Sequence, residues 1–232
     1  MTLILLPNLL DENADIDLYF PKNLQDIVAS LDSFIAEGEK NARKFLFKFL
    51  TRDQFQKLDI KLLNEHSTDD EIQDLLKLCS NKKCGLISDA GLPCIADPGS
   101  KLVYLAHKNN IDVQAIIGPS SIFLALMLSG LNAQRFCFHG YLLRKEDELI
   151  NQIKYLEDES KNKNSTQVFI EAPYRSDKML NILRKTLKKD TLLSLSINLT
   201  SKDEKVITKK VKDFQKTEIS IGKTPTVFLF LA

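Results

Sequence analysis

The amino-acid sequence predicts an α/β protein built from two α/β domains. Short apolar strand patterns alternate with helical patterns along the 232 residues, and this alternation is typical of layered α/β folds. A Gly-Pro-Ser-Ser stretch at residues 118–121 interrupts the alternation near mid-chain, where Gly and Pro end regular structure. We therefore predict an N-terminal domain of residues 1–118 and a C-terminal domain of residues 119–232.

The first domain is predicted to contain a largely parallel sheet, because each strand pattern is followed by a helical one. The strands are expected at Thr2–Leu6, Ser33–Glu37, Lys61–Asn64, Cys84–Ser88 and Asp112–Ile117. The helices are expected at Leu24–Ser30, Asn41–Leu50, Asp69–Leu78 and Ser100–Lys108. In the third helix, Ile72, Leu75 and Leu76 recur at helical spacing and mark a buried face.

The second domain has more strands per helix, which favours antiparallel pairing. Its strands are expected at Arg135–Gly140, Gln167–Glu171, Leu192–Asn198, Glu204–Thr208 and Thr226–Leu231. Its helices are expected at Ile122–Ser129, Glu146–Glu159 and Ser176–Lys188, with a serine capping the first of them.

Composition excludes several classes of protein. The chain is 44% hydrophobic and 27% charged, has no apolar run of membrane-spanning length, and opens without a signal-peptide pattern. We therefore expect a cytoplasmic protein without membrane contact. The cysteines (Cys79, Cys84, Cys94 and Cys137) fit no metal-binding spacing with the histidines, so we expect no metal and treat each cysteine as a buried apolar residue.

Charge is distributed unevenly along the chain. Residues 1–139 hold 14 Lys and Arg against 18 Asp and Glu, a net charge of −4, whereas residues 140–232 hold 18 against 13, a net charge of +5. The basic half could bind phosphate groups, although a solvated Lys-rich surface explains it equally well.

The segment from Gly85 to Gly99 carries the strongest functional signal. An apolar strand ends at Ser88, and Gly91 lets the following loop turn sharply and approach a ligand closely. Ligands of open α/β sheets bind beyond the carboxyl ends of strands, where this loop lies. Asp97-Pro98 is interpreted as the N-cap and first residue of the next helix. A ligand-binding loop is favoured over a plain connector.

The same segment resembles a signature of the tetrapyrrole methylases, in particular the branch that methylates ribose 2′-hydroxyls of ribosomal RNA. Ser88-Asp-Ala-Gly-Leu-Pro-Cys-Ile-Ala-Asp-Pro-Gly99 is similar to the family's Ser-Asp-Ala-Gly-Thr-Pro-x-Ile-Ser-Asp-Pro-Gly. Further matches follow in the same order. They are Ile117-Gly-Pro-Ser-Ser121, Phe136-Cys-Phe-His-Gly-Tyr-Leu142, Phe169-Ile-Glu-Ala-Pro-Tyr-Arg175 and Asn198-Leu-Thr200.

The resemblance thins toward both ends. The family's Thr-Pro-Ile-Gly-Asn is replaced by Leu5-Leu-Pro-Asn-Leu9, and its Ala-Glu-Asp-Thr-Arg appears as Ala36-Glu-Gly-Glu-Lys40. Its His-Glu-His-Asn is present as Asn64-Glu-His-Ser67. The final strand is not followed by the extra C-terminal region of the ribosomal enzymes, so the RNA substrate is less firmly indicated than the cofactor.

The resemblance implies a class III methyltransferase that holds S-adenosylmethionine in a cleft between its two α/β domains, usually within a homodimer. By this comparison, Ser120 and Ser121 lie at the hinge. The other residues expected to bind the cofactor are Pro7, Asp89, Ala90, Gly91, Ile95, Ala96, Ala172, Leu199, Pro225 and Thr226. For Asp89, capping of its own loop is an equal alternative.

Methyl transfer to a ribose hydroxyl needs an aligned nucleophile and benefits from a base. His66 is the first candidate for this base because histidine titrates near neutrality, and Glu37 is the second. Arg175 could bind a phosphate with its planar guanidinium group. The alternatives are a structural or surface role for His66 and an ion pair between Arg175 and Glu171 or another local carboxylate.

Three functions are therefore consistent with the sequence. The first is 2′-O-methylation of ribosomal RNA, with RNA or a ribosomal subunit as partner. The second is methylation of a small molecule such as a tetrapyrrole. The third is cofactor binding without catalysis, although Glu37, Glu65 and His66 still provide base-like groups.

Overall fold

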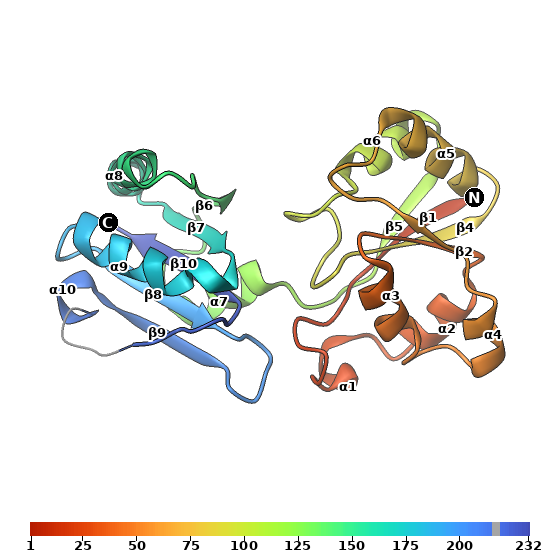
Figure 1. Ribbon diagram of the computed structural model, residues 1–232, viewed down its shortest axis with the longest axis horizontal. Helices are drawn as coiled ribbons and strands as arrows, with labels where there is room; N and C mark the ends of the chain where they lie inside the picture. Colours follow the sequence, from red (N-terminus) through yellow and green to blue (C-terminus); the bar gives the residue numbers. More distant parts are fainter. Residues whose placement is uncertain (215–218) are drawn as a thin grey trace. The chain divides into compact units, whose positions relative to one another are not determined.

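The computed structural model describes residues 1–214 and 219–232, and the chain divides into two compact units, Met1–Ser120 and Ser121–Ala232 (Figure 1). The boundary between the units lies after residue 120, two residues beyond the domain boundary predicted from the sequence. Each unit contains its own sheet and its own hydrophobic core.

The first unit is built around a parallel sheet with strand order β3-β2-β4-β1-β5. The strands are β1 (Thr2–Leu6), β2 (Ser33–Ala36), β3 (Ile60–Leu62), β4 (Lys83–Ile87) and β5 (Asp112–Ala115). Every strand pair is parallel, as predicted from the alternation of strand and helix patterns.

Helices cover both faces of this sheet (Figure 1). Alternate side chains of a strand point to opposite faces, so Ile4 and Leu6 enter one core and Leu3 enters the other. The first core also contains residues of α2 (Leu24–Ala29) and α3 (Glu39–Leu46); the second contains residues of α5 (Asp69–Cys79) and α6 (Ser100–Lys108). The short helices α1 (Ile16–Tyr19) and α4 (Arg52–Gln56) were not predicted.

The second unit contains a mixed sheet with strand order β6-β7-β10-β8-β9. The strands are β6 (Phe136–Tyr141), β7 (Thr166–Glu171), β8 (Leu192–Ile197), β9 (Lys205–Lys210) and β10 (Thr226–Leu231). Among the described residues of the second unit, only the β6–β7 pair is parallel, and the other three pairs confirm the predicted antiparallel pairing.

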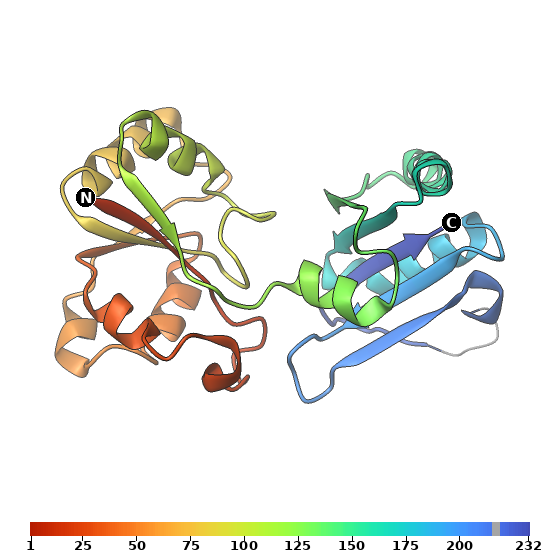
Figure 2. The same ribbon diagram turned by 180° about the vertical axis from the view of Figure 1, so that it is seen from behind.

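Two long helices, α8 (Glu146–Lys163) and α9 (Ser176–Thr186), pack on this sheet over a core in which the rings of Phe169 and Phe228 stack 5.4 Å apart. Helix α7 (Ser121–Ser129) contacts β8, β9 and β10, and Figure 2 shows it in front of the sheet, on the opposite side from α9. The remaining elements are the 3₁₀ turn η1 (Pro173–Arg175) and α10 (Val211–Phe214).

Two local predictions were wrong. Asp97 does not cap α6, because the helix begins at Ser100 after Gly99, whose φ of +132° favours glycine. A Cβ at Gly99 would also lie 2.7 Å from the Cys94 sulfur. Cys137 is exposed rather than buried, since it lies on the edge strand β6. None of the described helices is long and apolar enough to cross a membrane.

Candidate functional site

The candidate site lies at one edge of the first unit's sheet. Because all five strands are parallel, their carboxyl ends meet at this edge, which is where ligands of open α/β sheets bind. Pro7 follows β1, Glu37 follows β2, and the Asp89-Ala90-Gly91 loop follows β4. The fold therefore gathers three segments that are far apart in the sequence.

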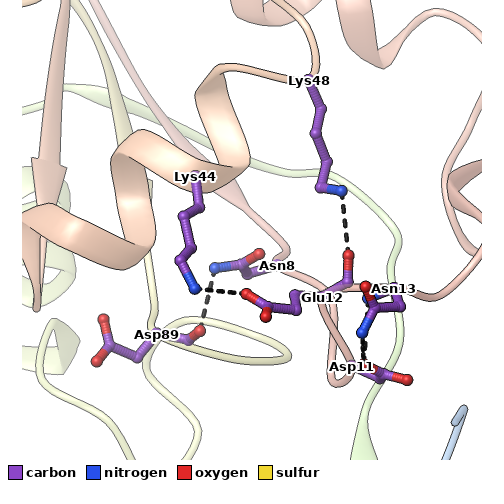
Figure 3. Close-up of polar contacts among 7 residues, drawn as sticks. All are labelled: Asn8, Asp11, Glu12, Asn13, Lys44, Lys48 and Asp89. Carbon is purple, nitrogen blue, oxygen red and sulfur yellow. Dashed lines mark hydrogen bonds and ion pairs between the residues drawn. The ribbon is translucent and has the colours of Figure 1, made fainter.

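Asn8 fixes the loop after β4 against the end of β1. Its side-chain amide donates hydrogen bonds to the carbonyl oxygens of Ser88 (3.0 Å) and Asp89 (3.1 Å), and Figure 3 shows the second of these. Its backbone exchanges two hydrogen bonds with Gly91, of 2.8 and 3.1 Å. Asn8 is 6% exposed, so these contacts define the position of the loop.

Gly91 has a φ of +73°, which only glycine adopts without strain, and a Cβ there would lie 3.3 Å from the Leu10 side chain. Further along the loop, Cys94 (φ 67°) and Ala96 (φ 64°) also occupy the left-handed region. Non-glycine residues in this region store backbone strain, which concentrates at functional sites. Ala90, Ile95 and Ala96 are exposed along this loop.

Three carboxylates surround the loop: Glu37, Asp89 and Asp97. Burial raises the pKa of Glu37, and the charge of Asp89 raises it further. Burial together with the charges of Glu37 and Asp89 raises the pKa of Asp97 to about 7. A Cβ at Gly38 would lie 2.8 Å from the Asp89 carboxylate, so the glycine leaves room for this side chain. The repulsion between these carboxylates is of the kind that a bound cation would relieve.

His66 lies in the turn after β3. Its backbone N–H donates to the Asn64 side-chain oxygen at 2.9 Å, and its ring nitrogen Nε2 lies 3.5 Å from a carboxylate oxygen of Glu65. Its side chain is 85% exposed, whereas Glu37 is half-buried. The structure thus places His66 and Glu37 at the carboxyl ends of neighbouring strands, in different surroundings.

In the second unit, Ala172, Leu199, Pro225 and Thr226 lie at one end of the sheet. Ala172 follows β7 and Leu199 follows β8, while Thr226 begins the antiparallel strand β10 between them. The Asn198 backbone N–H donates to the Pro225 carbonyl oxygen at 2.9 Å. The four residues predicted from the sequence as cofactor contacts of the second domain are therefore neighbours in the fold.

A strained residue lies beside this group. Thr200 has a φ of 70°, unusual for a β-branched residue, and its hydroxyl is buried with no hydrogen-bond partner among the described residues. A buried hydroxyl without a partner costs free energy, and such a cost is typical of functional sites.

Arg175 ends the η1 turn and forms an ion pair with Glu171 at 3.2 Å. Its side chain is 19% exposed, and the Glu171 side chain is 3% exposed. The structure therefore shows the local ion pair that the sequence left as an alternative to phosphate binding. Ser120 ends the first unit, and Ser121 begins α7.

A family model described as tetrapyrrole (corrin/porphyrin) methylases matches residues 22–215 of the chain. The chain belongs to this family. A protein named ribosomal RNA small subunit methyltransferase I from Streptococcus pyogenes is 36% identical over 171 residues, which cover 69% of this chain and 56% of that protein. Proteins of the same name from Synechocystis sp. and Thermotoga maritima are 31% and 30% identical, and the matches cover 61% and 72% of their lengths. The chain thus matches little more than half of the streptococcal relative.

Two solved structures share the fold of this tetrapyrrole methylase family member. A diphthine synthase matches with a TM-score of 0.67 at 15% identity, over 100% of this chain and 89% of that one. The methyltransferase CobJ matches with a TM-score of 0.60 at 14% identity, over 99% and 92%. The fold class and the family indicated by the sequence are confirmed.

Sequence reasoning missed two residues of the candidate site. Asn8 was noted only as a departure from the family pattern, although a polar residue next to Pro7 at the end of a buried strand could have identified it. Asp97 was assigned to a helix cap, because an Asp-Pro pair before a helix is typical of one. Its position beside Glu37 and Asp89 depends on the course of the loop, which the residue pattern does not encode.

Proposed function

We propose that this tetrapyrrole methylase family member is an S-adenosylmethionine-dependent methyltransferase that methylates a ribose 2′-hydroxyl of small-subunit ribosomal RNA. The observation that carries the proposal is the acidic sheet edge, where Glu37, Asp89 and Asp97 flank a strained, partly exposed loop. The names of the ribosomal RNA methyltransferases to which the chain is similar supply the substrate.

The residues present fit the proposed cofactor. S-adenosylmethionine supplies the methyl group from a positively charged sulfonium and also carries an ammonium group. A cluster of carboxylates in partly buried surroundings favours such a cation over the neutral sulfur of the demethylated product. Ala90 and Ala96 are exposed residues with small side chains, which leaves room for close approach. Ala172, Leu199, Pro225 and Thr226 are proposed contacts of the adenosyl part.

The chain's own residues orient the acceptor and remove its proton. A ribose hydroxyl is a weak nucleophile at neutral pH, so a base near it accelerates the transfer. Glu37 and His66 remain the proposed bases. The raised pKa of Glu37 makes it a stronger proton acceptor than an ordinary carboxylate, and this favours Glu37.

The exposed apolar side chains of α7 support a proposed homodimer, and the similarity to ribosomal RNA methyltransferases supports a proposed location in the cytoplasm. Phe123 is 51% exposed and Met127 is 75% exposed, and contiguous exposed apolar surface is typical of an interface. Light scattering on the purified protein would show a mass twice that of the 26.4 kDa chain.

The proposal is tested by calorimetry and by transfer of labelled methyl groups to purified small ribosomal subunits. We expect wild-type protein to bind S-adenosylmethionine and to methylate the subunits. Asp89→Asn should weaken S-adenosylmethionine binding about ten-fold and weaken binding of the demethylated product much less, because only the methyl donor carries the sulfonium charge. Equal losses for both ligands would contradict the role of the carboxylates, and absence of transfer to any RNA would contradict the substrate.

A second experiment compares the two candidate bases. If Glu37 accepts the proton, Glu37→Gln should lower the turnover rate by roughly 10²–10⁴-fold, whereas His66→Ala should lower it less than about ten-fold. The wild-type rate should rise with pH and flatten above the raised pKa of Glu37, since only the ionised carboxylate accepts a proton. The reverse order of losses would assign the base to His66.

A further inference from the structure

A basic and aromatic depression lies on the first unit, outside the acidic edge. It has a volume of about 640 Å³ and is lined by Glu12, Asn13, Lys40, Arg43, Lys44, Phe47, Lys48 and Phe55. The four cations come from α3 and the turn after it, and Glu12 is the one carboxylate in the lining. The unit that contains it has an excess of acidic residues, so this concentration of positive charge departs from its surroundings.

Two of the cations contact Glu12. Lys44 donates to the Glu12 carboxylate at 2.5 Å and Lys48 donates to the Glu12 backbone carbonyl at 3.1 Å (Figure 3). The hydrogen bond from Lys44 holds the pKa of Glu12 below its ordinary value, and the charges of Lys44, Lys48 and Lys40 lower it further. Arg43 is neutralised by an ion pair with Glu39 at 2.8 Å, and Glu12 balances Lys44. Lys40 and Lys48 form no ion pair with a carboxylate of the described residues, so their charge is not balanced. An anion with several phosphates would balance it.

Aromatic rings form the other part of the lining. The Phe47 side chain is 70% exposed, although a large apolar side chain is usually buried. Its ring makes an edge contact with Phe55 at 5.4 Å, and the Arg43 guanidinium lies 5.9 Å from the centre of the Phe55 ring. Phe55 thus holds both Phe47 and Arg43 in place. Surfaces that bind single-stranded nucleic acids combine exposed aromatic rings with cations, because the bases stack on the rings and the phosphates pair with the cations.

The depression adjoins the candidate site through two short segments. Glu12 follows Asn8 by four residues, which span at most about 14 Å. Lys40 follows Glu37 by three residues, and α3 begins directly after Gly38. The segments that form the acidic edge therefore continue into the basic depression.

We propose that this depression binds a single-stranded segment of the RNA substrate, with one base stacked on Phe47 and neighbouring phosphates on Lys40 and Lys48. This inference rests on the proposed function and adds the surface that holds the acceptor strand. A nucleotide placed there lies within a few nucleotides of the carboxylate edge.

The test measures binding of a fluorescent uridine oligomer of about eight nucleotides to the full chain by anisotropy. Phe47→Ala should weaken binding on the order of ten-fold through loss of stacking. Lys40→Ala and Lys48→Ala should each weaken binding and lower the slope of log K against log salt by about 0.7. Phe47→Leu keeps an apolar contact with Phe55 and should lose affinity with an unchanged melting temperature.

Matched controls are exposed residues of α5 and α6, the helices that contribute to the second core of the same unit. Tyr104→Ala removes an aromatic side chain that is 67% exposed on α6, and Lys77→Ala removes a charge that is 75% exposed on α5. Both should bind the oligomer like wild type.

Equal binding of the oligomer by wild type and by the depression variants would overturn the inference. If polyglutamate displaced the labelled oligomer as well as unlabelled oligomer does, the inference would also fail, and the depression would instead bind an acidic protein. Calorimetry with S-adenosylmethionine separates the two proposals. The depression variants should bind the cofactor normally, so loss of RNA affinity alone supports the depression. If wild type methylates ribosomal subunits and the depression variants do so equally well, the inference fails and the proposed function stands.

Discussion

At the scale of single residues, the candidate site is costly to the protein's stability. Asp97 is half-buried near Glu37 and Asp89, and none of the salt bridges within the described residues involves these three carboxylates. Like charges in partly buried surroundings repel one another and disfavour ionisation. Groups arranged in this way are typical of functional sites, where the arrangement serves a ligand at the expense of the folded state.

This cost predicts a pH-dependent gain in stability for Asp97→Asn. The pKa of Asp97 is about 7 in the folded chain and 3.8 when unperturbed. The folded state therefore binds more protons between these values, and the free energy of unfolding falls as the pH rises through this window. Asparagine cannot ionise, so the variant should melt several degrees higher than wild type at pH 8 and nearly equally at pH 4.

Thermal unfolding followed by circular dichroism across this pH range provides the measurement. Asp112→Asn, at an exposed position on β5, is the matched control and should follow the wild-type profile. A difference between wild type and Asp97→Asn that did not vary with pH would show that this carboxylate is not the titrating group.

At the scale of elements, the sequence predicted all ten strands found in residues 1–214 and 219–232, and the longer helices. Strands such as Thr2–Leu6 and Thr226–Leu231 match residue for residue, because buried strands are short apolar runs bounded by turn residues. The unpredicted helices α1, α4 and α10 have four or five residues each, too few to show a helical period.

The site was less predictable than the fold because it depends on loops. Gly91 could be recognised as a backbone requirement, and the structure gives it a φ of +73°. The hydrogen bonds of Asn8 join segments 80 and 81 residues apart, and no local pattern encodes such a contact. The depression beside α3 combines Glu12 with Lys44 across 32 residues, so its charge balance also needed the fold.

At the scale of the whole molecule, the two units have separate cores, and α7 is joined to the second. Its buried residues Ile122, Ala125 and Leu126 face the sheet of that unit, and the Ser129 carbonyl accepts a hydrogen bond from the Thr208 hydroxyl on β9 at 2.9 Å. Burial of one isoleucine and one leucine contributes about 3–6 kcal/mol, a large share of the 5–15 kcal/mol typical of a whole domain.

We therefore expect residues 121–232 to fold alone and residues 130–232 to fail. The longer fragment should unfold in one cooperative urea transition, whereas the shorter one exposes the sheet face that α7 covers.

Two neighbouring substitutions in the longer fragment test the contribution of α7 directly. Leu126→Ser removes a side chain that is 3% exposed and should lower the free energy of unfolding by about 3 kcal/mol, because it removes apolar burial and leaves a cavity. Met127→Ser, at a position 75% exposed, should change it by less than about 0.5 kcal/mol. Equal effects of both substitutions, or a cooperative transition of residues 130–232 at the same urea midpoint, would show that α7 does not stabilise the second unit.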